Sequence, residues 1–405
     1  MDIITQRLSQ PENKPVSCIE THTCGEPTRI IIDGYPDVTG TLLEQRAKAK
    51  AQHDDIRKRL ILEPRGHYEM YGAVLRPNTE LTRTGQAHMG VLFLTNEGYS
   101  TMCGHAIIAL GRFLVDTHDH KIFPRRNNIT WNRSALVASL NIHAPCGILR
   151  VKVPVKKDGK SSDPTRPVSF VSVPSFATGV NIPVNINHYW PQLEKALTPK
   201  GSISVDFAYG GAFYAFVDAS SLGFDAPLED INMLDLSKAT ECLLSSIREN
   251  PELTEYFQHP EEADLSFLYG VIVTDDTFRE KGRVLGAELG ITFFADQQID
   301  RSPTGSGVAA RAALAYCKGE REAGISWTYH SLVSTRGLGP PFVGTIEPET
   351  IETNEGRPAQ VCVRVEGQAF YTGFSTFSVE PADPLGDAGF VFAKASNLAL
   401  SDGGQ

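Results

Sequence analysis

The feature that most constrains this chain is a short helix that is apolar on all sides, and the sequence contains it twice. The first runs from Ala106 to Val115 with Arg112 as its only charged residue, and the second runs from Val308 to Cys317 with Arg311 as its only charge. A surface helix shows a single apolar stripe, whereas a helix that is apolar all round lies in a core. The chain must therefore bury two helices, each among other elements.

Strand-like segments precede and follow each of these helices. This order predicts two related domains, each with strands wrapped round one helix, and the α/β or α+β class rather than a parallel βαβ array. We expect the first domain to span residues 16–178 and the second to span 179–371. Because Phe370–Val379 is strand-like and follows the second domain, we expect residues 372–400 to return and complete the first.

The charge of the chain limits its partners. Its 48 acidic and 38 basic residues give a formal net charge of −10, which disfavours nucleic acid or an anionic membrane as the main partner. The stretch Thr41–Leu62 predicts one helix with many basic residues, but Glu44, Asp54 and Asp55 lie among them, as on a solvated face. A small anionic ligand remains compatible, since backbone N–H groups rather than net charge would bind it.

The cysteines indicate a compartment. All seven are scattered and none forms a C-x-x-C pair, which favours a reducing environment. The first residues lack the basic-then-apolar pattern of a secretory signal, and no apolar run is long enough to cross a bilayer. We therefore expect a cytoplasmic protein.

Each buried helix begins next to a residue that can take part in chemistry. Cys103 precedes the first helix and Thr304 precedes the second. The start of a helix carries free N–H groups and the positive end of the dipole, which bind anions and lower the pKa of a thiol. If the two domains face each other, both helix starts can hold one carboxylate. The N–H groups that would bind it belong to Gly104, His105, Gly305 and Ser306.

In that arrangement Cys103 and Thr304 flank the carbon next to the carboxylate from opposite faces. A thiol whose pKa falls toward neutrality can act as a base and remove the proton of that carbon. An alkyl hydroxyl is too weakly acidic to give or take a proton alone, although it can donate a hydrogen bond or hold a water. The pair therefore predicts proton abstraction from one face of a small carboxylic acid.

Other interpretations remain open from the residues alone. Cys103 can be one more buried cysteine, with the glycines only shaping turns. Cys103 and His105 can bind a metal, but two ligands are too few and no other histidine has zinc spacing, so we expect no metal. Gly305–Gly307 lacks the lysine and the length of a phosphate loop. Cys24, in H-T-C-G-E-P, can be a nucleophile, although we favour a structural role.

Ordered motifs indicate a family. M-C-G-H at 102–105 and D-R-S-P-T-G-S-G at 300–307 each open a buried helix. With them, the chain resembles the proline racemase family, in particular its trans-3-hydroxy-L-proline dehydratase branch, over nearly its whole length. The other motifs are H-T-C-G-E-P-T-R at 22–29, E-P-R-G-H at 63–67, M-Y-G-A at 70–73, V-P-S-F at 173–176, A-Y-G-G-A-F-Y-A at 208–215 and Y-T-G at 371–373.

The resemblance implies an α+β fold similar to diaminopimelate epimerase, with two pseudo-symmetric domains, each a curled, mostly antiparallel sheet around a central buried helix. It also implies a homodimer and a site in the cleft that needs no cofactor. In the racemases both helix starts carry cysteine, one removing the α-proton and the other supplying a proton to the opposite face. Here Cys103 matches the first and Thr304 replaces the second, which marks the dehydratase branch.

The resemblance also implies the roles of the remaining site residues. Asp300 would hold the ring nitrogen, where its charge complements the ammonium. Tyr71 and Phe294 would form aromatic walls around the ring, with Tyr71 in place of a phenylalanine of the racemases. Ala212 stands where many members have asparagine. The contacts to the carboxylate and ring would come from Gly104, His105, Gly305 and Ser306.

The stereochemistry of the implied substrate, a hydroxyproline, agrees with a single acid–base group. In trans-3-hydroxy-L-proline the α-hydrogen and the hydroxyl lie on the same ring face, so Cys103 can remove the proton and return it to the departing hydroxide. The expected product is Δ1-pyrroline-2-carboxylate, with Thr304 positioning the substrate. Two alternatives remain: a proline or 4-hydroxyproline racemase or epimerase with a water on Thr304, and a catalytically silent amino-acid-binding paralogue.

Overall fold

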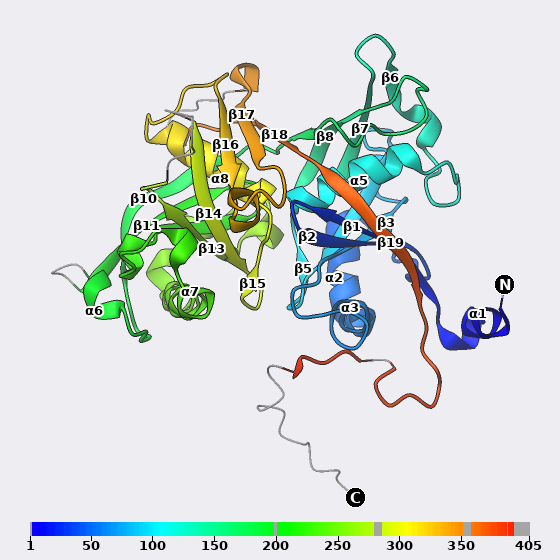
Figure 1. The fold of residues 1–405 in the computed structure, drawn as a ribbon, viewed down its shortest axis with the longest axis horizontal. Coiled ribbons are helices and arrows are strands. Elements are labelled where there is room, and N and C mark those ends of the chain that lie inside the picture. The colour runs from blue at the N-terminus through cyan, green and yellow to red at the C-terminus, as the bar shows by residue number, and fades with distance from the viewer. Residues whose placement is uncertain (1, 198–200, 279–285, 351–357, 387, 393–405) are drawn as a thin grey trace, which may run out of the picture.

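The computed structural model describes residues 2–197, 201–278, 286–350, 358–386 and 388–392. The described strands form one nineteen-stranded, mostly antiparallel sheet, and helices pack against it, so the expected α+β class is confirmed. Figure 1 shows two groups of elements side by side, one around α5 and one around α8. Among the described residues, no helix is long and apolar enough to cross a bilayer.

The elements before residue 175 make up the first group, with β19 from the end of the chain. Its helices are α1 Ile3–Leu8, α2 Leu42–Gln52, α3 Asp54–Ile61, α4 Glu80–Arg83 and α5 Gly104–Asp116. Its strands are β1 Val16–Thr23, β2 Glu26–Asp33, β3 Gly72–Arg76, β4 Met89–Leu94, β5 Tyr99–Ser100, β6 Thr130–Asn132, β7 Val137–Ala144, β8 Gly147–Pro154, β9 Val168–Val171 and β19 Ala369–Phe377.

The elements from residue 176 to residue 367 make up the second group. Its helices are α6 Leu193–Ala196, α7 Met233–Arg248, α8 Gly305–Cys317 and α9 Leu332–Thr335. Its strands are β10 Phe176–Asn185, β11 Ser202–Tyr209, β12 Phe213–Asp218, β13 Leu268–Asp275, β14 Ala287–Phe294, β15 Gln298–Ile299, β16 Ser326–His330, β17 Phe342–Ile346 and β18 Val363–Gly367.

The order of strand pairing recurs between the two groups. In the first, β2 pairs parallel with β3 and β4 pairs parallel with β7, while β1–β2, β3–β4, β4–β5, β7–β8 and β8–β9 are antiparallel. Strands β11 to β18 repeat this series in the same order and directions. The last strands of the two series, β9 and β18, pair with each other. One ladder therefore joins the two groups.

The end of the chain returns to its beginning, because β19 pairs antiparallel with β1 (Figure 1). Strand β10 takes the same place beside β11. Residues 387 and 393–400 of the expected returning segment lie outside the described residues. The domain boundaries at 16–178 and 179–371 remain a prediction.

The two apolar helices are the centres of the groups. In each of α5 and α8, eleven of thirteen residues are buried. Helix α5 packs against β1, β7, β8 and β9, and α8 packs against β10, β11, β17 and β18. Both helices begin earlier than the apolar pattern alone suggested, at Gly104 and Gly305. Strands therefore surround each helix, as its composition predicts.

The single helix expected over Thr41–Leu62 is wrong, because the chain breaks at His53, whose φ of −136° is not helical. Two helices result, α2 and α3. The expected solvated face holds for Lys48, Lys50 and Lys58, which are exposed. It does not hold for Arg57, which is buried and donates from Nη1 to the carbonyls of Thr95 and Asn96, both at 2.8 Å. Asp54 balances this charge with a bond of 2.6 Å to Arg57 Nε.

Candidate active site

Helices α5 and α8 meet at their N-terminal ends. A Cβ atom on Gly104 would lie 2.4 Å from Gly305 Cα, and one on Gly305 would lie 2.7 Å from Gly104 Cα. Real Cβ atoms do not approach other atoms so closely, so only glycine allows the two helix starts to touch. This approach brings Cys103 and Thr304 to one buried site, where the two residues are 4% and 5% exposed.

Cys103 caps α5, and its sulfur accepts a hydrogen bond from Ala106 N–H at 3.3 Å. The expected fall in its pKa is nevertheless wrong. Burial raises the pKa of the Cys103 thiol well above its usual value, against the smaller lowering effects of Ala106 N–H and the Tyr71 hydroxyl. Removing the thiol from water disfavours its charged form more than the helix end stabilises it. The negative charge of Asp300 acts in the same direction as burial.

His105 lies directly beside the thiol. Its Nδ1 is 3.2 Å from Cys103 Sγ and 4.0 Å from Asp300 Oδ2. Burial lowers the pKa of His105, although Asp300 and a hydrogen bond to the Pro27 carbonyl oppose this. Burial thus favours the neutral ring. Since a neutral imidazole has one N–H, donation to Pro27 leaves the other nitrogen as an acceptor for the S–H proton.

Thr304 occupies the matching position at α8 with a strained backbone, since its φ is +62°. Its hydroxyl oxygen lies 2.7 Å from Asp300 Oδ2 and 2.7 Å from Thr292 Oγ1. The other oxygen of Asp300 accepts from Ser302 N–H at 2.8 Å. The hydroxyl is thus held in place by two polar groups, and the Asp300 carboxylate lies next to it.

Aromatic side chains pack beside His105. Tyr71 lies edge-on to His105 with ring centroids 4.7 Å apart, and Phe294 lies 6.1 Å from Tyr71. Behind Phe294, Tyr269 stacks at 5.4 Å. Ser306 Oγ lies 2.7 Å from the Tyr214 hydroxyl. The structure therefore brings together every residue that the sequence suggested for the site.

Several neighbours of the site were not predicted. Thr292 and Tyr269 lie in strands whose sequence pattern is apolar, so no sequence signal distinguished them from core residues. Tyr214 and Glu26 lie inside motifs noted above, A-Y-G-G-A-F-Y-A and H-T-C-G-E-P-T-R, but their positions gave them no role. Only the folded chain places them beside the helix starts.

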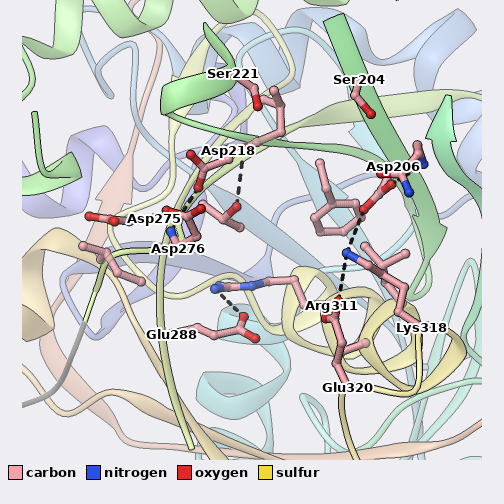
Figure 2. A pocket seen from close by; sticks show the side chains of 17 residues that line it. Ser204, Asp206, Asp218, Ser221, Asp275, Asp276, Glu288, Arg311, Lys318 and Glu320 are labelled. Atoms are coloured by element: carbon pink, nitrogen blue, oxygen red, sulfur yellow. Dashed lines mark hydrogen bonds and ion pairs between the residues drawn. The ribbon is translucent and has the colours of Figure 1, made fainter. Parts of the chain in front are cut away.

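A pocket of about 500 Å³ lies farther along α8 and shares no residue with this site (Figure 2). Arg311 and Lys318 reach into it among several acidic side chains, and Arg311 Nη2 pairs with Glu288 Oε2 at 2.6 Å. Lys318 Nζ pairs with Asp206 Oδ2 at 3.4 Å. Within the part of the chain that the structure describes, no group of His, Cys, Asp or Glu is suited to a metal ion. We assign this pocket no ligand, because its cations are already paired.

The protein is thus an α+β protein with one site where the N-terminal ends of two buried helices meet. One helix start carries the Cys103 thiol and the other carries the Thr304 hydroxyl. The family model described as proline racemase matches residues 18–391. The chain belongs to the proline racemase family.

Two of the curated relatives share one activity in their names. A trans-L-3-hydroxyproline dehydratase of Bos taurus is 42% identical over 94% of this chain and 96% of its own length. A trans-3-hydroxy-L-proline dehydratase of Bacillus cereus is 32% identical over 94% of this chain and 98% of its own. Among solved structures, a hydroxyproline epimerase of Agrobacterium vitis has a TM-score of 0.72 at 22% identity, covering 93% of this chain and 95% of that one. This last likeness concerns the fold alone.

Proposed function

We propose that this chain dehydrates trans-3-hydroxy-L-proline to Δ1-pyrroline-2-carboxylate and water, with Cys103 as the base that removes the α-proton. The names of the relatives that are about 40% identical support the reaction. The observation that carries the mechanism is the pairing of Cys103 on one helix start with Thr304 on the other, held within 2.7 Å of Asp300. The residue at the first helix start is then a thiol, and the residue at the second is a hydroxyl that cannot transfer a proton by itself.

The two helix starts suit the carboxylate of the substrate. Gly104, His105, Gly305 and Ser306 supply backbone N–H groups at the positive ends of α5 and α8, where an anion is stabilised. With the carboxylate there, Cα lies between Cys103 and Thr304. The same donors also stabilise the negative charge that develops on the carboxylate as the α-proton leaves.

The reaction then needs one base. The Cys103 thiolate takes the α-proton, the electrons of the Cα–H bond form a Cα=C3 double bond, and the C3–O bond breaks. The departing oxygen takes the proton back from Cys103 and leaves as water. The resulting enamine tautomerises to the cyclic imine. Base and leaving group lie on one ring face, so the thiolate is regenerated in the same turnover.

Activation of the thiol has to overcome its burial. The neighbouring neutral His105 can accept the S–H proton at 3.2 Å. The ammonium of the bound amino acid adds a positive charge near the sulfur, and an opposite charge within about 4–6 Å favours a thiolate. We therefore propose that the thiolate forms with the substrate in place rather than before binding.

Replacement of Cys103 by Ser tests the base. Because an alkoxide is far less accessible than a thiolate, we expect the Cys103→Ser variant to lose dehydration by about 100-fold or more. The measurement is release of pyrroline-2-carboxylate from trans-3-hydroxy-L-proline. Cys317→Ser, at the exposed end of α8, is the matched control and should keep full activity. Near-normal turnover by the Cys103 variant would contradict the proposed base.

Two other functions are less well supported. A racemase or epimerase needs a second acid–base group, and the Thr304 position offers a hydroxyl. A silent amino-acid-binding protein would bind hydroxyproline but release no pyrroline-2-carboxylate and exchange no α-hydrogen in D2O. We also propose that the enzyme needs no cofactor and acts as a cytoplasmic homodimer, which rests on resemblance to the family. Light scattering of the purified protein tests the dimer.

A further inference from the structure

Glu26 is a buried carboxyl group beside the site that the mechanism above does not use. It begins β2, and its side chain is fully buried. One oxygen, Oε2, accepts a hydrogen bond from Arg301 N–H at 2.8 Å. The other oxygen, Oε1, has no hydrogen-bond partner among the described residues. A buried carboxyl oxygen without a partner is destabilising, so it calls for an explanation.

The location of Glu26 suggests an explanation for this unpartnered oxygen. Its hydrogen bond to Arg301 N–H places its carboxyl group against the residue that follows Asp300. The charge of Glu26 also acts on the Cys103 thiol, whose pKa it helps to raise. Glu26 therefore lies within electrostatic reach of both groups between which the substrate would sit.

The ring nitrogen of the substrate needs more than one acceptor. A secondary ammonium has two N–H groups, and both must find acceptors when the ring is buried. Asp300 is the acceptor expected on this side, but its Oδ1 already bonds Ser302 N–H and its Oδ2 already bonds the Thr304 hydroxyl. Asp300 can therefore accept fewer hydrogen bonds from the ring ammonium. The unpartnered oxygen of Glu26 can accept the second N–H.

We propose that Glu26 is a substrate-binding residue whose Oε1 accepts one N–H of the ring ammonium while Asp300 accepts the other. The inference rests on the proposed function in one respect: it takes the ligand to be a cyclic secondary amino acid. It extends that function by assigning cation recognition to a carboxylate pair on two different halves of the chain. Selectivity for a charged ring nitrogen would follow from the pair.

The electrostatics of Glu26 agree with this role. Burial, and after it the charge of Asp300, raises the pKa of Glu26 well above its usual value. Two close carboxylates repel each other, and an ammonium between them relieves that repulsion. The positive charge of Arg301 also lowers the pKa of Glu26. However, Arg301 Nη1 lies 3.9 Å from Glu26 Oε2 and pairs with Glu69 Oε2 at 2.6 Å.

Binding of two ligands of the same shape tests the proposal. L-Proline carries the ammonium, whereas L-tetrahydrofuran-2-carboxylate has a ring oxygen in its place and no N–H group. In Glu26→Gln, which keeps the shape and an acceptor for Arg301 N–H, we expect L-proline to bind about tenfold more weakly. L-Tetrahydrofuran-2-carboxylate should bind at least as tightly as to the unchanged protein, because it has no N–H group to lose an acceptor and the substitution removes a negative charge near an anion. Calorimetry on the full chain measures both.

Glu69→Gln is the matched control. Glu69 contacts the same arginine and accepts from Ile299 N–H at 3.0 Å, but it is partly exposed and should change neither affinity. Glu26→Asp keeps the charge and should recover part of the L-proline affinity. An equal loss for both ligands in Glu26→Gln would indicate a structural role and overturn the proposal, as would unchanged L-proline binding. If the proposed function is wrong, the unchanged protein will release no pyrroline-2-carboxylate from trans-3-hydroxy-L-proline. The binding measurements would still decide the role of Glu26.

Discussion

At the scale of residues, the site is asymmetric. Cys103 and Thr304 occupy equivalent places at two helix starts, yet only the thiol can exchange a proton near neutral pH. The Thr304 hydroxyl is engaged by Asp300 and Thr292. The number of acid–base groups, rather than the shape of the site, therefore separates one-sided elimination from two-sided inversion.

Placing a second thiol should change the outcome. In D2O the unchanged protein should exchange the α-hydrogen of L-proline without inversion, because protons come and go from one face. In Thr304→Cys we expect slow appearance of D-proline, since the new thiol can protonate the opposite face. Chiral chromatography with deuterium detection by mass spectrometry measures both. Thr304→Ser is the control and should give no D-proline; D-proline from the unchanged protein would contradict one-sided chemistry.

At the scale of elements, the contact between α5 and α8 depends on the absence of two side chains. The Cβ positions of Gly104 and Gly305 overlap the backbone of the opposite helix. Backbone atoms cannot swing away as a flexible side chain can. The glycines therefore set the distance between the two helix ends and, with it, the space in which a carboxylate would bind.

Gly104→Ala should force the helix starts apart. We expect it to lower the free energy of unfolding by about 1–3 kcal/mol, as for overpacking in a core, and to reduce turnover more strongly than stability alone would explain. Thermal unfolding and product assays measure the two effects. Gly98→Ala is the control: no atom lies within 4 Å of its Cβ position, so it should change stability by less than about 0.5 kcal/mol. Equal effects of the two variants would refute the packing argument.

At the scale of the whole molecule, equivalent turns from the two groups of elements hold each other. Asn96, in the turn between β4 and β5, donates from Nδ2 to the carbonyl of Asp296, in the turn between β14 and β15, at 3.3 Å. Asp296 N–H donates back to Asn96 Oδ1 at 3.3 Å. Gln298 adds bonds to Asn96 N–H and to the Met70 carbonyl. Met70 and Gln298 of this seam are close in sequence to the buried Tyr71 and Asp300, so we expect a substrate to enter only when the chain opens.

Weakening the seam should make opening more frequent. Asn96→Ala removes both turn-to-turn bonds, so we expect stability to fall by about 1–3 kcal/mol and Cys103 to be alkylated faster by iodoacetamide. Mass spectrometry of the Cys103 peptide measures the rate, with exposed Cys317 as an internal reference. Asn127→Ala, on the exposed surface, is the control. An unchanged Cys103 rate in Asn96→Ala would mean that this seam does not limit access.

The sequence by itself determined the two buried helices, the α+β class and the residues at the helix starts. Apolar composition around a whole helix has one stable solution, which is burial, and that can be seen along the chain. The surroundings of a thiol cannot be seen along the chain, because the groups that bury Cys103 and place charge near it are far away in sequence, as Asp300 is. Only the tertiary structure therefore decided that the thiol pKa rises rather than falls. It also showed the break at His53 and the place of Glu26 beside the site, where Glu26 contacts Arg301 from far along the chain.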